Sequence, residues 1–291
     1  MAGYRGRFFI RQRVWRCGGY AEVELYPVFQ PPGRRRGRCR PTRECQARLN
    51  ERDAENRLRR LVLANFGEAD LEVDLTYAGE ESIEIEAGAS PKGAPRARNG
   101  ALEDMTKFIR KLRREYKKAG AELRYVYIWE QGKKSPKVHF HLILNAGVLS
   151  RDEVEALWGH GHANSRRLRL DETGLAGLTE YLTKKSRRKQ RATGQRRWSC
   201  SKNLMRPEPE ISDGEVTVGE LRTIAEDVER RNAECWAQPG MTLVEAEALR
   251  NRVNRGLYVY LNLAPPEAWH GRRPVPRYFS GELGGDPDEP M

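Results

Sequence analysis

Two stretches of the chain alternate apolar and polar residues with a period of two, the pattern of a half-buried β-strand. In residues 71–77 the leucines, a valine and Tyr77 fall on one face, and Asp74 and Thr76 fall on the other. In residues 137–144 the apolar face alternates with His139 and His141. Because side chains alternate along a strand, the two imidazoles point to the same side. Both stretches therefore predict a strand with one face buried and one face available for polar chemistry.

Apolar residues elsewhere recur at threes and fours, which predicts amphipathic helices, or alternate again. The expected helices cover residues 42–65 after a Thr42 cap, about 99–119 before Gly120, 151–158 after a Ser150 cap, 175–185, 221–236 and 242–254. The expected further strands cover residues 21–26, 123–130, 163–170, 196–201 and 257–263, and residues 79–100 are expected to form a long loop. Together these elements predict an α+β fold.

Composition shifts divide the chain into three parts. Residues 1–65 form a basic N-terminal segment with a strand, an arginine cluster and an entry helix. Residues 66–205 carry the strongest periodicities and form the central domain. A Pro-Glu-Pro sequence from Pro207 then introduces residues 206–291, an accessory segment for DNA contact, packing or oligomerisation that ends in a tail expected to be disordered.

Charge narrows the partners. The 291 residues include 53 Lys and Arg against 41 Asp and Glu, a formal charge of +12, which favours a polyanion such as nucleic acid, although a solvated basic surface would give the same count. Neither a run of 18 apolar residues nor a signal peptide is visible, so we expect a cytoplasmic protein in a bacterial host cell, without a membrane partner. Five scattered cysteines argue against a disulfide framework and against a structural zinc site.

A turn-forming segment, residues 131–136, joins the strand at 123–130 to the histidine strand and predicts an antiparallel hairpin. If the apolar residues of both strands share the core, Glu130 falls on the face of His139 and His141. Two imidazoles and a carboxylate suit Mg²⁺ or Mn²⁺ with positions left open for a phosphate. The alternative is that the histidines are ordinary residues of a half-buried strand and that Glu130 points into water. His160 and His162, which flank Gly161, are expected in a turn rather than in a second metal site.

The helix expected at 175–185 places Tyr181 beside its buried stripe, with Lys184 and Lys185 three and four residues further on. A phenol becomes a good nucleophile only when a nearby cation favours its phenolate, and a lysine and a metal-bound phosphate would supply that field. The alternative is a buried structural tyrosine. The run from Lys184 to Arg197 contains no acidic residue, as expected of a track for a nucleic-acid backbone. The residues expected to bind DNA are Arg187, Arg188, Lys189, Arg191, Arg196 and Arg197.

These three motifs resemble, in order and spacing, those of the HUH endonucleases, and in particular the single-tyrosine rolling-circle replication initiators of small plasmids and phages. The motifs are Asp-Leu-Thr-Tyr from Asp74, His-Phe-His from His139 and Tyr-x-x-Lys from Tyr181. The resemblance covers roughly residues 66–204. It implies a ferredoxin-like core whose central antiparallel sheet is flanked by helices and holds the histidines. It also implies that Tyr181 attacks single-stranded DNA and forms a 5′-phosphotyrosine, which a later 3′-hydroxyl can reseal.

Some features depart from that pattern or leave alternatives open. Asp74 stands where the family usually has a hydroxyl or apolar residue, and we leave it out of the expected ligand set. Tyr181 is the one plausible nucleophile. The sequence contains no phosphate-binding loop of an NTPase, so host helicase and polymerase are expected partners. A conjugative relaxase or a single-strand transposase would use the same chemistry. A non-catalytic nucleic-acid-binding domain would use the tyrosines for stacking. The origin sequence and the oligomeric state stay open.

Overall fold

The computed structural model describes residues 8–29, 44–78, 96–131, 138–169, 175, 178, 198–251, 255–266 and 275–283. The fold is α+β, as predicted, and the chain divides into two compact units. Unit 1 combines Met1–Ala64, Asp171–Gly174 and Arg206–Met291, and unit 2 combines Asn65–Leu170 and Leu175–Met205. None of the described helices is long and apolar enough to cross a membrane.

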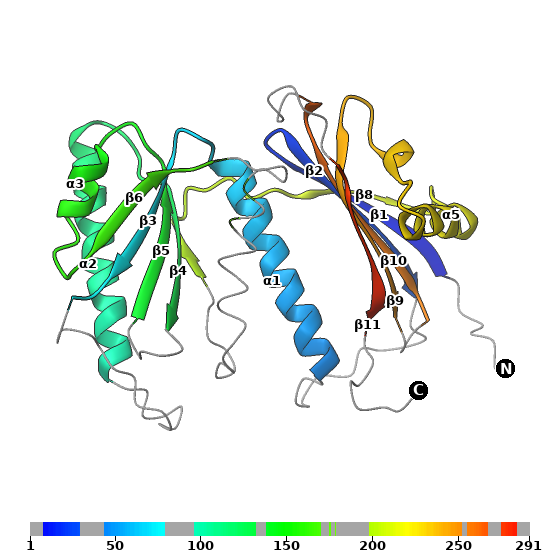
Figure 1. Cartoon of the computed structure of the whole chain (residues 1–291), viewed down its shortest axis with the longest axis horizontal. Coiled ribbons are helices and arrows are strands. Elements are labelled where there is room, and N and C mark those ends of the chain that lie inside the picture. The colour runs from blue at the N-terminus through cyan, green and yellow to red at the C-terminus, as the bar shows by residue number, and fades with distance from the viewer. Residues whose placement is uncertain are drawn as a thin grey trace. The chain divides into compact units, whose positions relative to one another are not determined.

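Unit 2 is built on a five-stranded sheet with the order β6-β3-β5-β4-β7, in which all neighbours are antiparallel. Its strands are β3 (Leu71–Thr76), β4 (Tyr125–Gln131), β5 (Val138–Leu144), β6 (Ala163–Arg167) and β7 (Trp198–Cys200). Helix α2 (Arg96–Lys118) connects β3 to β4, and helix α3 (Arg151–Ala156) connects β5 to β6 (Figure 1). This strand–helix–strand–strand–helix–strand order is the ferredoxin-like arrangement that the sequence predicts, with β7 added at one edge.

One face of this sheet is packed against α2 and α3 (Figure 1). The apolar residues of segment 71–77 are at most 4% exposed, and they form one cluster with Phe140 and Leu142 of β5 and with Met105 and Phe108 of α2. Helix α2 begins at Arg96, three residues earlier than the sequence suggests. Because this face is filled with apolar side chains, the polar residues of β3 and β5 must point to the opposite face.

Unit 1 has a six-stranded sheet with the order β11-β9-β10-β2-β1-β8. Its elements are β1 (Phe8–Cys17), β2 (Tyr20–Phe29), α1 (Glu44–Asn65), β8 (Pro209–Asp213), α5 (Val218–Glu229), η3 (Glu234–Trp236), β9 (Thr242–Asn251), β10 (Leu257–Ala264) and β11 (Arg277–Leu283). Helix α5 covers one face of the sheet and α1 lies along the other (Figure 1). Strands β1 and β2 pair with β8 and β10, so the N-terminal and C-terminal segments of the chain build one sheet together.

Three sequence predictions for this unit are wrong. Residues 242–254, predicted as a helix, form strand β9 from Thr242 to Asn251, because pairing with β10 and β11 overrides the helix propensity of their Ala, Glu and Leu. The helix predicted at 221–236 ends at Glu229 and is followed by the short η3. The tail predicted to be disordered contains β11, whereas residues 284–291 lie outside the described part.

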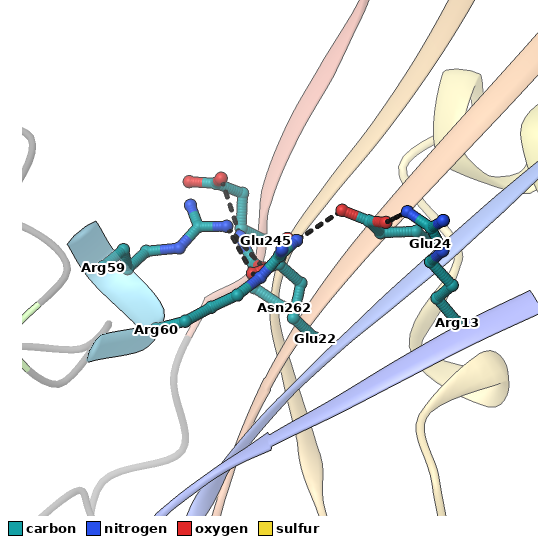
Figure 2. A network of polar contacts seen from close by, with 7 residues as sticks. All are labelled: Arg13, Glu22, Glu24, Arg59, Arg60, Glu245 and Asn262. Atoms are coloured by element: carbon teal, nitrogen blue, oxygen red, sulfur yellow. Dashed lines mark hydrogen bonds and ion pairs between the residues drawn. The ribbon is translucent and has the colours of Figure 1, made fainter. Parts of the chain in front are cut away.

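Helix α1 is held on the sheet by a buried network of charges (Figure 2). Arg60 donates to both carboxylate oxygens of Glu22, at 3.1 and 2.6 Å, and also to Glu24, while Arg59 forms an ion pair with Glu22 at 2.8 Å. The guanidinium of Arg60 also lies 3.8 Å from the ring centre of Trp15. Burial alone would raise the pKa of Glu22, but the two arginines outweigh it and lower that pKa to about 2. The network therefore stays ionised at neutral pH.

Candidate metal centre

The register of three neighbouring strands assembles a polar cluster on the face of the unit 2 sheet opposite α2. Asp74 of β3 lies directly across from His141 of β5, and Thr76 lies across from His139. On the other side of β5, Glu130 of β4 lies across from His139. Since each strand exposes every second residue to this face, side chains of three strands converge on the histidine strand.

His141 is held between two carboxylates. Its Nδ1 lies 2.5 Å from Oδ1 of Asp74, and its Nε2 lies 3.2 Å from Oε1 of Glu130. The prediction that Glu130 shares the histidine face is confirmed. Asp74, which the sequence analysis left out, is the nearer of these two partners. Its polar position opposite the apolar face of β3 was the available signal, but only the β3–β5 register shows that it reaches the imidazole.

These contacts decide the protonation state of the metal-free site. Burial alone lowers the pKa of His141, but its hydrogen bonds to Asp74 and Glu130 and their negative charges outweigh burial and raise that pKa to about 9. The imidazole is therefore protonated at neutral pH when no metal is bound. A cation that binds this nitrogen must displace the proton.

Two further charged residues extend the cluster along the sheet. Glu72 of β3, with a side chain 6% exposed, receives two hydrogen bonds from Arg166 of β6, at 2.9 and 2.8 Å. The same guanidinium lies 3.4 Å from Oδ2 of Asp74. The sequence analysis assigned no role to Glu72 or Arg166, because the pairing of β3 with β6 bridges about ninety residues.

The donor set fits a hard divalent ion. Glu72, Asp74 and His141 each offer a ligand atom, and these atoms lie within 4.8 Å of one another. Carboxylate oxygens and an imidazole nitrogen suit Mg²⁺ or Mn²⁺. The predicted ligand set differs in part: His141 and Glu130 meet, whereas His139 is placed beside them by register alone. The set of His139, His141 and Glu130 therefore stays a prediction.

The turn before β6 is confirmed as the place of His160 and His162. Backbone N–H groups of Thr76 and Ala78 donate to their carbonyl oxygens at 2.9 and 3.1 Å, so the turn continues the pairing of β6 with β3. Gly161 lies so close to β3 that a Cβ atom would come within 2.3 Å of the Ala78 nitrogen, and its φ is +150°. The glycine is required here by a close backbone approach.

The remaining predicted site residues lie outside the described part of the chain. They are Tyr181, Lys184, Lys185, Arg187, Arg188, Lys189, Arg191, Arg196 and Arg197. From the same predicted helix, Leu175 and Leu178 are described: Leu175 is buried, as its position on the predicted apolar stripe requires, and Leu178 is half-buried. The roles of Tyr181 and the basic residues stay predictions.

Comparison with known proteins gives one family. No curated protein sequence is similar enough to the chain to count as a relative. Residues 73–186 match the family model of the replication-associated protein ORF2. The matched stretch begins within β3, contains the whole β4–β5 hairpin and β6, and extends past Tyr181 and Lys185. It covers less than half of the chain and lies in unit 2 except for Asp171–Gly174. The match supports a DNA-replication protein of the initiator type.

Proposed function

We propose that this protein initiates rolling-circle replication by nicking single-stranded DNA at an origin and later rejoining the strand. The observation that carries the proposal is His141, held between Asp74 and Glu130 on a rigid sheet, within a stretch that matches replication-associated proteins. The HUH assignment and the single-tyrosine mechanism are parts of this proposal and rest on the order of the sequence motifs.

In the proposed reaction, the phenolic oxygen of Tyr181 attacks the scissile phosphorus. The bond from phosphorus to the 3′ oxygen breaks, the 3′ oxygen takes up a proton, and the 5′ phosphate stays on the tyrosine. Lys184, or alternatively Lys185, offsets negative charge on the phenolate and the phosphate. The later attack of a 3′-hydroxyl reverses these steps, so that the strand is rejoined without an external energy source.

His139, His141 and Glu130 would hold the Mg²⁺ or Mn²⁺ ion on the Nε2 side of His141. When bound, such an ion withdraws charge from a non-bridging phosphate oxygen. Asp74 holds the other ring nitrogen of His141 and so fixes the orientation of the imidazole, as carboxylates behind metal-bound histidines commonly do. In this assignment Asp74 is a positioning residue and Glu130 is a ligand.

The DNA strand would follow the basic run after Lys184. Arg187, Arg188, Lys189, Arg191, Arg196 and Arg197 would contact its phosphates, which predicts binding that weakens steeply with salt. Host helicase and polymerase would supply unwinding and synthesis. A relaxase or a transposase would use the same site, and the DNA sequence that is cleaved would separate them from an initiator.

The test is a denaturing gel of the protein incubated with labelled single-stranded DNA from its own locus and Mn²⁺. We expect a slow-migrating covalent protein–DNA band with the wild type, and none with Tyr181→Phe or without metal. Tyr127→Phe is the matched control, because Tyr127 packs in the core beside Tyr125 and should leave the adduct unchanged. Binding without any adduct on oligonucleotides that tile the locus would favour a non-catalytic DNA-binding module instead.

A further inference from the structure

Arg166 occupies the side of the polar cluster that faces away from Glu130. It comes from the edge strand β6, and its planar guanidinium bonds to both oxygens of Glu72 while it also approaches Asp74. Glu72 is nearly fully buried, and a buried carboxylate needs a paired cation to stay ionised. The geometry thus places a fixed positive group among the oxygen atoms that, with His141, would otherwise form a three-residue metal site.

Counting charges shows what this guanidinium does. Glu72, Asp74 and Glu130 together carry three negative charges, and Arg166 carries one positive charge. One divalent ion with a neutral His141 brings these groups to zero. A second divalent ion would leave them at +2, whereas a cluster without Arg166 would remain at −1 after the first ion. Two-metal sites hold their ions about 3.5–4 Å apart, and here the space next to the first ion contains Arg166.

We propose that Arg166 takes the place of a second metal ion and limits this centre to one divalent cation, held on the Nε2 side of His141. The inference rests on the metal centre of the proposed function. It adds that Glu72 is not a metal ligand and that Arg166 determines the stoichiometry of metal binding.

The test measures Mn²⁺ bound to the full chain by equilibrium dialysis, with electron paramagnetic resonance to count free ions. We expect one Mn²⁺ per chain for the wild type, two for Arg166→Met, and one for Arg166→Lys, which keeps the charge. Arg167→Met is the matched control, because the neighbouring Arg167 bonds to the Ala69 carbonyl instead of the cluster and should keep one ion. A single ion in Arg166→Met with wild-type affinity would overturn the proposal.

Glu72→Gln provides a second test that does not depend on the folding of Arg166→Met. If Glu72 serves only to hold Arg166, this variant keeps one ion and loses less than tenfold in affinity. A larger loss would show that Glu72 is a ligand and would overturn the inference.

The wild-type result separates the two proposals. A wild type that binds no Mn²⁺ removes the metal centre of the proposed function together with this inference. A wild type that binds two ions, or an Arg166→Met variant that still binds one, removes only the role of Arg166 and leaves the nicking reaction to its own test.

Discussion

The raised pKa of His141 makes metal affinity depend on pH in a calculable way. Without metal, the imidazole is protonated below about pH 9 because Asp74 and Glu130 stabilise its positive charge. A metal ion on Nε2 requires the neutral ring, so proton and metal compete for the same atom. As the pH rises toward that pKa, a larger share of the sites is ready for the ion, and the apparent affinity increases.

The size of the effect follows from the pKa. At pH 7, two units below a pKa of about 9, roughly one site in 100 has a neutral His141, which weakens metal binding about 100-fold, or about 2.7 kcal/mol. A histidine with its ordinary pKa of 6.5 would be mostly neutral at pH 7 and would cost almost nothing. Between pH 7 and 8.5 we therefore expect the apparent Mn²⁺ affinity to rise about tenfold per pH unit.

Isothermal titration calorimetry with Mn²⁺ at several pH values measures this slope directly. Asp74→Asn removes one of the charges that raise the pKa of His141, so its affinity should rise less steeply over the same range. Asp104→Asn is the matched control, because Asp104 bonds to Tyr77 among the residues packed on the α2 side of the sheet and should keep the wild-type slope. A wild-type affinity that does not change between pH 7 and 8.5 would refute the competition between proton and metal.

Three further outcomes concern stability. The metal-free protein should lose about 3 kcal/mol between pH 6.5 and 9, because the contribution of the raised His141 pKa is complete below 6.5 and is lost as the pH passes about 9; urea denaturation across this range, compared with His141→Gln, measures it. Arg60→Met should destabilise unit 1 by about 3–5 kcal/mol, because it leaves Glu22 buried without its bidentate partner, and Arg60→Met with Glu22→Gln should recover part of that loss in the same assay. Gly161→Ala should lower thermal stability by about 1–3 kcal/mol through its clash with β3, whereas Gly159→Ala, whose Cβ meets nothing within 4 Å, should cost only about 1–2 kcal/mol of backbone strain; equal losses would contradict the clash.

The sequence predicts part of the candidate site because a short turn sets the register of β4 against β5. With six residues between the strands, the alternation of apolar residues was enough to place Glu130 beside His141, as the 3.2 Å contact confirms. The pairing of β3 with β5 and β6 joins residues about seventy and ninety positions apart. No local pattern determines such a register, and so Asp74, Glu72 and Arg166 could not be assigned from the sequence.

The same distinction explains the outcome for the fold. In unit 2 the strong alternation of β3 and β5 and the apolar stripe of α2 predicted both elements, since each side of the pattern packs into one core. In unit 1 the strand β9 has the composition of a helix, and β1 alternates arginines with apolar residues in a segment that reads as a basic arm. Both become strands because they pair with distant partners, and tertiary pairing overrides weak local propensities.

The arrangement also indicates how the proposed labour is divided within unit 2. The groups that would bind the ion come from strands whose backbone positions are set by the antiparallel ladder, and their orientation is set by carboxylates on neighbouring strands. Such a site is preorganised before DNA arrives, because its ligands need not move to meet the cation. The proposed nucleophile belongs instead to the segment that follows β6, which supplies no residue to the described cluster. Metal binding should therefore be a property of the sheet, and strand transfer should require the later segment in addition.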